Sequence, residues 1–288
     1  MSPAAAPPFD PAAIRAVLLD IEGTTTPVGF VYNVLFPFAR ARLRSFLEAH
    51  LTGPEVHADV EALRREHAAD AQHSLAPPPW PDSPERHVES AAAYALWLMD
   101  GDRKSTPLKS LQGRIWEAGY RSGELRGQVY LDVPPALARW KQQGRCIAIF
   151  SSGSVQAQQL LFRHSTAGDL TPFIDAYFDT TTGPKQQPQS YRRIADAIAT
   201  RPAATTGTRK ERQGGATAPS LLPQADAERA VAKHLFGPEA ILFISDVAGE
   251  LDAARAAGMH TLLAVRASAK PPCEAGHRAI HSFDAILA

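Results

Sequence analysis

The sequence has few cysteines and no net charge, and these two shortages exclude several classes of protein. Only two cysteines, Cys146 and Cys273, occur in 288 residues, too few for a disulfide framework or a structural zinc cluster. Lys plus Arg and Asp plus Glu both number 30, so the formal net charge is zero. Because no charge excess extends over the chain, we expect neither nucleic acid nor a membrane surface as a partner.

Long apolar runs are also absent. The longest, around residues 91–99, is far shorter than the ~20 residues that a membrane-spanning helix needs. Residues 1–8 are rich in Ala and Pro and lack the basic and apolar segments of a signal peptide. We therefore expect a cytoplasmic protein whose residues 1–12 form a flexible leader.

Short apolar runs that alternate with helical patterns predict the fold class. The runs are residues 16–19, 146–150, 176–178, 241–244 and 261–265. Their apolarity is continuous, which is typical of strands covered on both faces in a parallel sheet. Helical spacing of apolar residues appears between them, at 135–143, 191–198 and 251–257. The alternation predicts an α/β fold with a doubly wound, mostly parallel sheet.

Two regions interrupt this alternation. Residues 28–128 show helical faces but no strand pattern, which predicts a helical cap inserted directly after the first strand. Residues 201–223 are rich in Gly, Thr, Ala, Pro and charge, which predicts a flexible loop insertion without a core of its own. The predicted domains are a leader at 1–12, a catalytic core at 13–27 and 129–288, and a cap at 28–128.

Acidic residues stand at the carboxyl ends of two predicted strands. Asp20 ends the first strand and Glu22 follows two residues later, while Asp246 ends the strand at 241–244 and Glu250 follows it. Ligands of open α/β sheets bind at this edge. A carboxylate there can attack phosphorus, and carboxylate oxygens suit a hard cation such as Mg²⁺. The alternative is that each aspartate only caps a turn or helix.

Hydroxyl groups and one lysine follow two other strands. Ser151 and Ser152 come directly after the strand at 146–150, where hydroxyls and free N–H groups at a helix start can bind phosphate oxygens. Lys185 follows the strand at 176–178 and can neutralise a phosphate and its attacking group. The alternatives are simple N-capping by Ser152 or Ser154 and a solvated surface charge at Lys185.

The order of these residues resembles the haloacid dehalogenase-like phosphatase superfamily, whose pattern is a nucleophilic Asp, a Ser or Thr, a Lys and then an acidic pair. Glu22 departs from it, because most of these phosphatases have Asp there. With Glu22, the segment 102–109 and the run 151–154, the chain resembles the enolase-phosphatases of methionine salvage (acireductone synthases) from about residue 17 to residue 266.

The resemblance implies the chemistry. The substrate is 2,3-diketo-5-methylthiopentyl-1-phosphate, which the family enolises and then dephosphorylates through an aspartyl-phosphate to give an acireductone. Asp20 is then the nucleophile and Glu22 the acid and base, while Ser151, Ser152 and Lys185 bind the substrate. Asp20, Glu22 and Asp246 hold one Mg²⁺ per subunit, Glu22 through its backbone carbonyl, and we expect a monomer.

Two other functions remain open at this point. One is a phosphatase of the same superfamily that acts on another small phosphate ester, and the other is a non-catalytic interaction protein with this fold. Since the core motifs contain nothing that recognises a methylthio tail or a diketone, we expect the cap to select the substrate. Its candidates are Phe30, Tyr32, Phe36, Arg103, Lys104 and Lys109.

Overall fold

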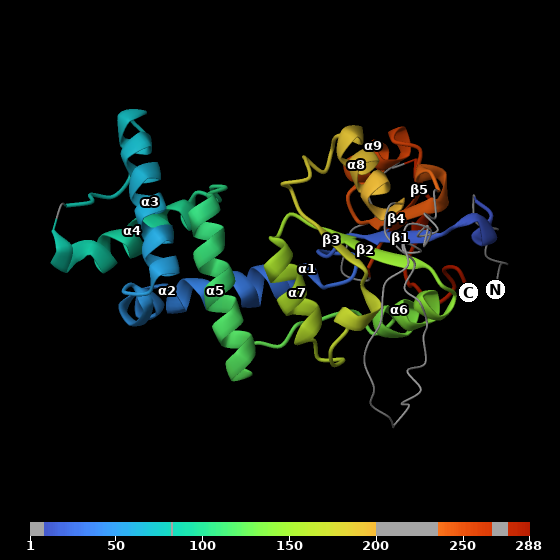
Figure 1. Ribbon diagram of the computed structural model, residues 1–288, viewed down its shortest axis with the longest axis horizontal. Coiled ribbons are helices and arrows are strands. Elements are labelled where there is room, and N and C mark those ends of the chain that lie inside the picture. The colour runs from blue at the N-terminus through green and yellow to red at the C-terminus, as the bar shows by residue number, and fades with distance from the viewer. Residues whose placement is uncertain (1–8, 82, 200–235, 267–275) are drawn as a thin grey trace, which may run out of the picture.

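A single parallel sheet is the centre of the fold. The computed structural model describes residues 9–81, 83–199, 236–266 and 276–288. Within these ranges six strands pair in the order β3-β2-β1-β4-β5-β6, all parallel (Figure 1). They are β1 Ala16–Leu19, β2 Cys146–Phe150, β3 Ala176–Phe178, β4 Ile241–Ser245, β5 His260–Ala264 and β6 Ala279–Ile280. Sequence predicted the first five; β6 is a two-residue edge strand without an apolar run.

Helices cover both faces of the sheet. Helices α6 (Val133–Gln142) and α7 (Val155–Arg163) pack on one face, and α8 (Pro188–Ala199) and α9 (Ala248–Ala256) on the other (Figure 1). Successive residues of β1 therefore enter two separate cores, Leu18 on one face and Leu19 on the other. The strands are continuously apolar because both of their faces are covered by helices. The predicted α/β class is confirmed.

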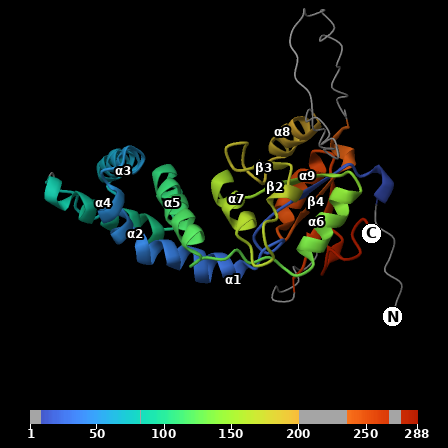
Figure 2. The same ribbon diagram turned by 60° about the horizontal axis from the view of Figure 1, so that its bottom comes forward.

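A layer of helices follows β1 and contains no strand within the described part of residues 28–122. It consists of α1 (Val28–Phe30), the π-helical η2 (Val31–Leu35), α2 (Phe36–His50), α3 (Pro54–Gln72), α4 (His87–Asp100) and α5 (Thr106–Ser122). These helices have their own apolar core, with Leu43, Leu63 and Leu98 fully buried. Helix α5 also packs against α7, which joins the layer to the sheet (Figure 2).

Short turns complete the described elements. They are the 3₁₀ helices η1 (Pro11–Ala13), η3 (Pro84–Arg86), η4 (Thr171–Phe173) and η5 (Pro238–Ala240). Of residues 9–12, predicted as the end of a flexible leader, Phe9 is instead buried and its ring lies 5.1 Å from that of His260, whereas residues 10–12 are exposed. The predicted loop at 201–223 lies outside the described residues. No helix of the described chain could cross a membrane.

The side chain of Arg266 contacts three segments that are distant in the sequence. Its guanidinium is 5% exposed and donates from Nε and Nη2 to the carbonyl oxygen of Thr24, at 2.9 and 2.7 Å. Its Nη1 donates to Asp132 Oδ2 at 2.7 Å, and the rings of Tyr130 and Phe283 lie 4.3 and 4.4 Å from it. The turn after β1, the segment before α6 and the C-terminal residues therefore share one buried cation.

We predict that Arg266→Met lowers the free energy of unfolding by about 3–5 kcal/mol, because it removes the cation that pairs with the Asp132 carboxylate and both guanidinium donors to the Thr24 carbonyl. Arg139→Met is the matched control. Arg139 donates to the Phe283 and Ile286 carbonyls only, so its loss should cost about 1–2 kcal/mol. Urea unfolding of both variants measures the difference, and equal losses would contradict this account of Arg266.

Candidate active site

The turn after β1 places Asp20 at the carboxyl edge of the sheet. The N–H groups of residues 24, 25 and 26 all donate to the carbonyl oxygen of Ile21, at 3.2, 3.0 and 2.9 Å, and the Thr25 hydroxyl donates to the Asp20 carbonyl at 3.1 Å. Gly23 sits in the left-handed region with a φ of 69°, and a Cβ there would overlap Asp246 Oδ2. Glycine is therefore required where the two acidic turns meet.

Lys185 reaches Asp20 from the loop after β3. Its Nζ lies 2.7 Å from Asp20 Oδ1 and 2.7 Å from Glu250 Oε2, and the side chain is 8% exposed. Ser245 donates to Glu250 Oε2 at 3.0 Å. Burial alone would lower the pKa of Lys185, but the charges of Asp20 and Glu250 raise it above its usual value. The lysine is therefore held as an ammonium ion against Asp20, and the predicted solvated surface charge is wrong.

Negative charge is crowded around Asp20. Burial, followed by the charge of Asp20, raises the pKa of Glu22 and raises that of Asp246 to about 6. Burial and Asp20 act in the same direction on the pKa of Glu250. Lys185 offsets only part of this repulsion, so a further cation is favoured beside Asp20 and Asp246.

The carboxylates nevertheless form no closed metal cage. Within the described residues, no group of three or more His, Cys, Asp and Glu side chains is arranged to hold a metal ion. The carboxylates of Asp20 and Asp246 fit Mg²⁺, which retains waters and takes one or two carboxylates together with substrate phosphate. They do not fit zinc, which takes three or four His, Cys or carboxylate ligands.

The hydroxyl groups after β2 have different surroundings. Ser151 is buried and its Oγ accepts a hydrogen bond from Gly153 N at 3.2 Å. Ser154 caps α7, since its Oγ accepts from Ala157 N at 3.3 Å. Ser152 is exposed, and its hydroxyl makes no hydrogen bond to the described residues. Capping is therefore confirmed for Ser154 and is wrong for Ser152, whose hydroxyl stays available to a ligand.

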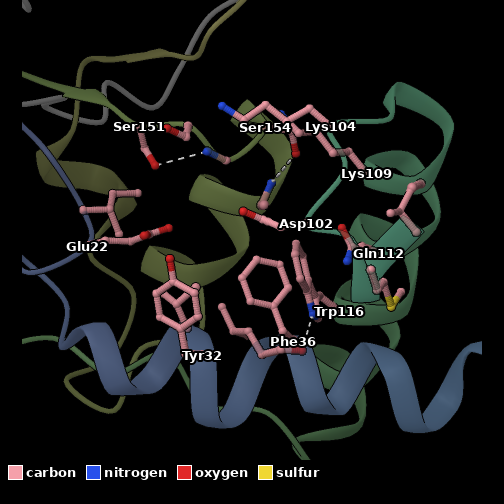
Figure 3. Close-up of a pocket in the computed structure, with 18 of the residues that line it drawn as sticks. Glu22, Tyr32, Phe36, Asp102, Lys104, Lys109, Gln112, Trp116, Ser151 and Ser154 are labelled. Atoms are coloured by element: carbon pink, nitrogen blue, oxygen red, sulfur yellow. Dashed lines mark hydrogen bonds between the residues drawn. The ribbon is translucent and has the colours of Figure 1, made fainter. Parts of the chain in front are cut away.

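A pocket of about 680 Å³ lies between the sheet and the helical layer (Figure 3). Ile21, Glu22 and residues 151–154 line it from the sheet side. The helical layer contributes the rings of Tyr32, Phe36 and Trp116 together with Asp102, Lys104, Lys109 and Gln112. Asp20, Lys185 and Asp246 do not line this pocket; Asp20 directly precedes the lining residue Ile21 in the chain.

Two of the predicted cap residues have other roles. Phe30 is 2% exposed, belongs to the core beside the sheet and does not line the pocket. Arg103 borders the pocket, but its Nη2 is paired with Asp70 Oδ1 at 2.8 Å. Neither the burial of Phe30 nor the pairing of Arg103 could be predicted, because sequence spacing does not tell which side of a segment faces the pocket.

Sequence reasoning missed the partners that hold the predicted residues in place. Glu250 was noted only as an acid behind Asp246, and the roles of Ser245 and Arg266 were not predicted. For Glu250 and Ser245 a signal was available, because both residues lie close to the start of α9 and to Asp246 in the sequence. Nothing in the sequence indicates that Arg266 reaches Thr24, 242 residues away.

Comparisons with known proteins agree with this site. Residues 14–206 match the haloacid dehalogenase-like hydrolase family. The chain is 45% identical over 276 residues to an enolase-phosphatase E1 of Synechococcus elongatus, covering 96% of this chain and 99% of the relative. It is 43% identical over 272 residues to that of Sorangium cellulosum, covering 94% and 97%.

A solved structure gives the same result for the fold. The UTR4 protein of Saccharomyces cerevisiae superposes with a TM-score of 0.67 at 28% identity, covering 94% of this chain and 99% of the yeast chain. Together with the parallel sheet and the acidic turn after β1, these similarities show that the chain belongs to the haloacid dehalogenase-like hydrolases and, within them, to the enolase-phosphatase family.

Proposed function

We propose that this protein is the enolase-phosphatase of methionine salvage, which converts 2,3-diketo-5-methylthiopentyl-1-phosphate to the acireductone and phosphate. The observation that carries the proposal is the buried contact of Lys185 with Asp20 beside the pocket, in a chain 45% identical to a named enolase-phosphatase over nearly its whole length. The further proposal that the protein is a cytoplasmic monomer comes from the sequence alone.

Asp20 is the proposed nucleophile. Lys185 and the N–H of Ile21 both contact its Oδ1 at 2.7 Å, which orients the carboxylate, while Oδ2 accepts a longer hydrogen bond of 3.4 Å from the Ser245 hydroxyl. Oδ2 is the oxygen proposed to attack phosphorus. The bond from phosphorus to the ester oxygen breaks as the aspartyl-phosphate forms. Ser151 and Ser152, at the turn that leads into α7, are the proposed phosphate ligands.

Glu22 is the proposed acid and base. Burial, followed by the charge of Asp20, raises the pKa of its carboxyl above the usual value, which favours the protonated form that a departing ester oxygen needs. The resulting carboxylate can then activate the water that hydrolyses the aspartyl-phosphate. Glu22 lines the pocket and points into it (Figure 3), so it faces the leaving group rather than the attacking one.

Haloacid dehalogenase-like phosphatases generally use Mg²⁺, and we propose one ion per subunit. Asp20, Asp246 and the backbone carbonyl of Glu22 would hold it. When bound, the ion supplies the charge that offsets repulsion between Asp20 and the phosphate, and it polarises the diketone.

The helices between residues 28 and 128 are the proposed cap, and residues 13–27 and 129–288 the proposed catalytic core. Tyr32, Phe36 and Trp116 offer an apolar wall suited to a methylthio tail, with 6.0 Å between the rings of Phe36 and Trp116. Lys104 and Lys109 offer cations for the carbonyl oxygens. Substrate choice is therefore proposed to rest on the cap, because the aromatic rings and lysines that line the pocket all belong to it.

We predict that Asp20→Asn lowers phosphate release by at least about 1000-fold, because an amide is a poor nucleophile and a poor metal ligand. The matched control is Asp252→Asn, an exposed acid near Asp246 that pairs with Arg255, which should behave as wild type. Steady-state assays with an aryl phosphate measure both variants. Near-normal release by the Asp20 variant would rule out covalent catalysis by this residue.

We predict that removal of divalent cations abolishes phosphate release and that Mg²⁺ restores it, since the available ligands are hard oxygens. The measurement is turnover after dialysis against EDTA, followed by titration with MgCl₂. The melting temperature of the dialysed protein, unchanged from the starting material, is the control. Full turnover in excess EDTA would contradict the proposed metal site.

We predict that Lys104→Met and Lys109→Met each lower kcat/KM for the diketone phosphate at least about tenfold more than for an aryl phosphate. Polar groups placed for a carbonyl discriminate strongly between substrates. Arg103→Met is the contrast, because its charge is engaged by Asp70 and its loss should affect both substrates alike. Equal losses on the two substrates in the lysine variants would remove these residues from substrate recognition.

A further inference from the structure

Only two carboxylates line the pocket among the described residues, and they come from opposite sides. Glu22 belongs to the core and Asp102 to the cap. Figure 3 shows both side chains directed into the same cavity. The proposed reaction contains two separate proton transfers, one from carbon during enolisation and one to oxygen during phosphoryl transfer. Pairs of acids in different surroundings commonly divide such tasks.

The backbone at Asp102 is unusual for a residue with a side chain. Its φ is 46°, in the left-handed region. The Asp102 N–H donates to the Met99 carbonyl at 3.2 Å and the Arg103 N–H to the Leu98 carbonyl at 2.9 Å, which is the pattern that ends a helix with glycine. Glycine would therefore suit the end of α4 better, and aspartate at this position points to a use for its carboxylate.

Two of the three residues that follow Asp102 are held by partners within the cap. Arg103 pairs with Asp70, which also accepts from the Tyr94 hydroxyl at 2.7 Å. Ser105 caps α5 and donates to Glu66 Oε2 at 2.6 Å. With these two side chains fixed in the cap, the alternate residues Asp102 and Lys104 are left facing the pocket.

We propose that the Asp102 carboxylate is the base that removes the carbon-bound proton in the enolisation step; this rests on the proposed function. The carboxylate takes a proton from C1, the carbon that carries the phosphate ester. The C1–H electron pair forms the C1–C2 double bond, and the C2 carbonyl pair moves onto its oxygen. The ammonium group of Lys104 is placed to stabilise the resulting enolate.

The other groups that line the pocket are less suited to this step. The charge of Glu22, then burial, then the charge of Asp102 raise the pKa of Tyr32, so its phenol stays protonated and is a donor rather than a base. Glu22 lies two residues after Asp20, on the core side where the phosphoryl group is proposed to react. Asp102 is exposed, so a proton that it takes from carbon exchanges readily with water.

Proton exchange at C1 tests the proposal separately from phosphate release. The probe is a phosphonate analogue of the diketone phosphate that keeps the C1 hydrogens but cannot be hydrolysed, incubated with the full chain and Mg²⁺ in D₂O. Loss of the C1 proton signal by NMR measures the step. We expect Asp102→Asn and Asp102→Gly each to slow exchange at least about 100-fold, the usual contribution of a general base.

The glycine variant separates catalysis from folding. Because glycine suits the left-handed backbone, Asp102→Gly should melt at or above the wild-type temperature while it loses exchange. Asp100→Asn is the matched control: this carboxylate lies two residues away, pairs with Arg40 at 2.6 Å and does not line the pocket, so exchange should match wild type.

Two results would overturn the proposal, and they differ. Wild-type exchange by the two Asp102 variants would exclude Asp102 as the base and leave the proposed function intact. A wild-type protein that hydrolyses an aryl phosphate, yet neither exchanges C1 protons nor releases phosphate from the diketone phosphate, would overturn the proposed substrate and this inference with it.

Discussion

The buried ion pair between Lys185 and Asp20 is the interaction on which the site depends. Two carboxylates and one ammonium group are removed from water together, and burial of an unpaired charge there would cost several kcal/mol. Glu250 completes the arrangement by contacting the lysine, and Ser245 donates to Glu250. Three strands must therefore be in register before Asp20 has its partner: β1, β3 through its following loop, and β4 with the start of α9.

The turn after β1 is held from a second direction. Arg266 binds the carbonyl of Thr24 and the carboxylate of Asp132, and residue 132 lies in the segment that returns from the helical layer to the sheet. The same guanidinium thus restrains the turn that carries Glu22 and the return connection. The turn and the return connection therefore share one buried set of direct contacts.

The pocket divides the chemistry between two parts of the chain. Oxygen ligands, hydroxyls and the acid Glu22 come from the carboxyl edge of a parallel sheet, where main-chain groups and strand ends converge. Aromatic rings and Lys109 come from the helices of the layer, and Asp102 and Lys104 from the connection between α4 and α5. Under the proposed function, the phosphoryl-transfer groups lie on the sheet side and the groups that select the ester lie on the helical side.

The sequence by itself determined the elements and the order of the chemistry. Continuous apolar runs identified five strands, and Asp20, Ser151, Lys185 and Asp246 could be predicted because parallel strands present their ends at one edge. The tertiary structure alone decided which groups touch: that Glu250 holds Lys185, that Arg266 reaches Thr24, that Arg103 turns to Asp70 while Asp102 faces the pocket, and that Phe30 is core. Local periodicity shows which side chains share a face of a helix or strand. Long-range partners depend on how distant segments pack against each other, and no short stretch of the sequence specifies that packing.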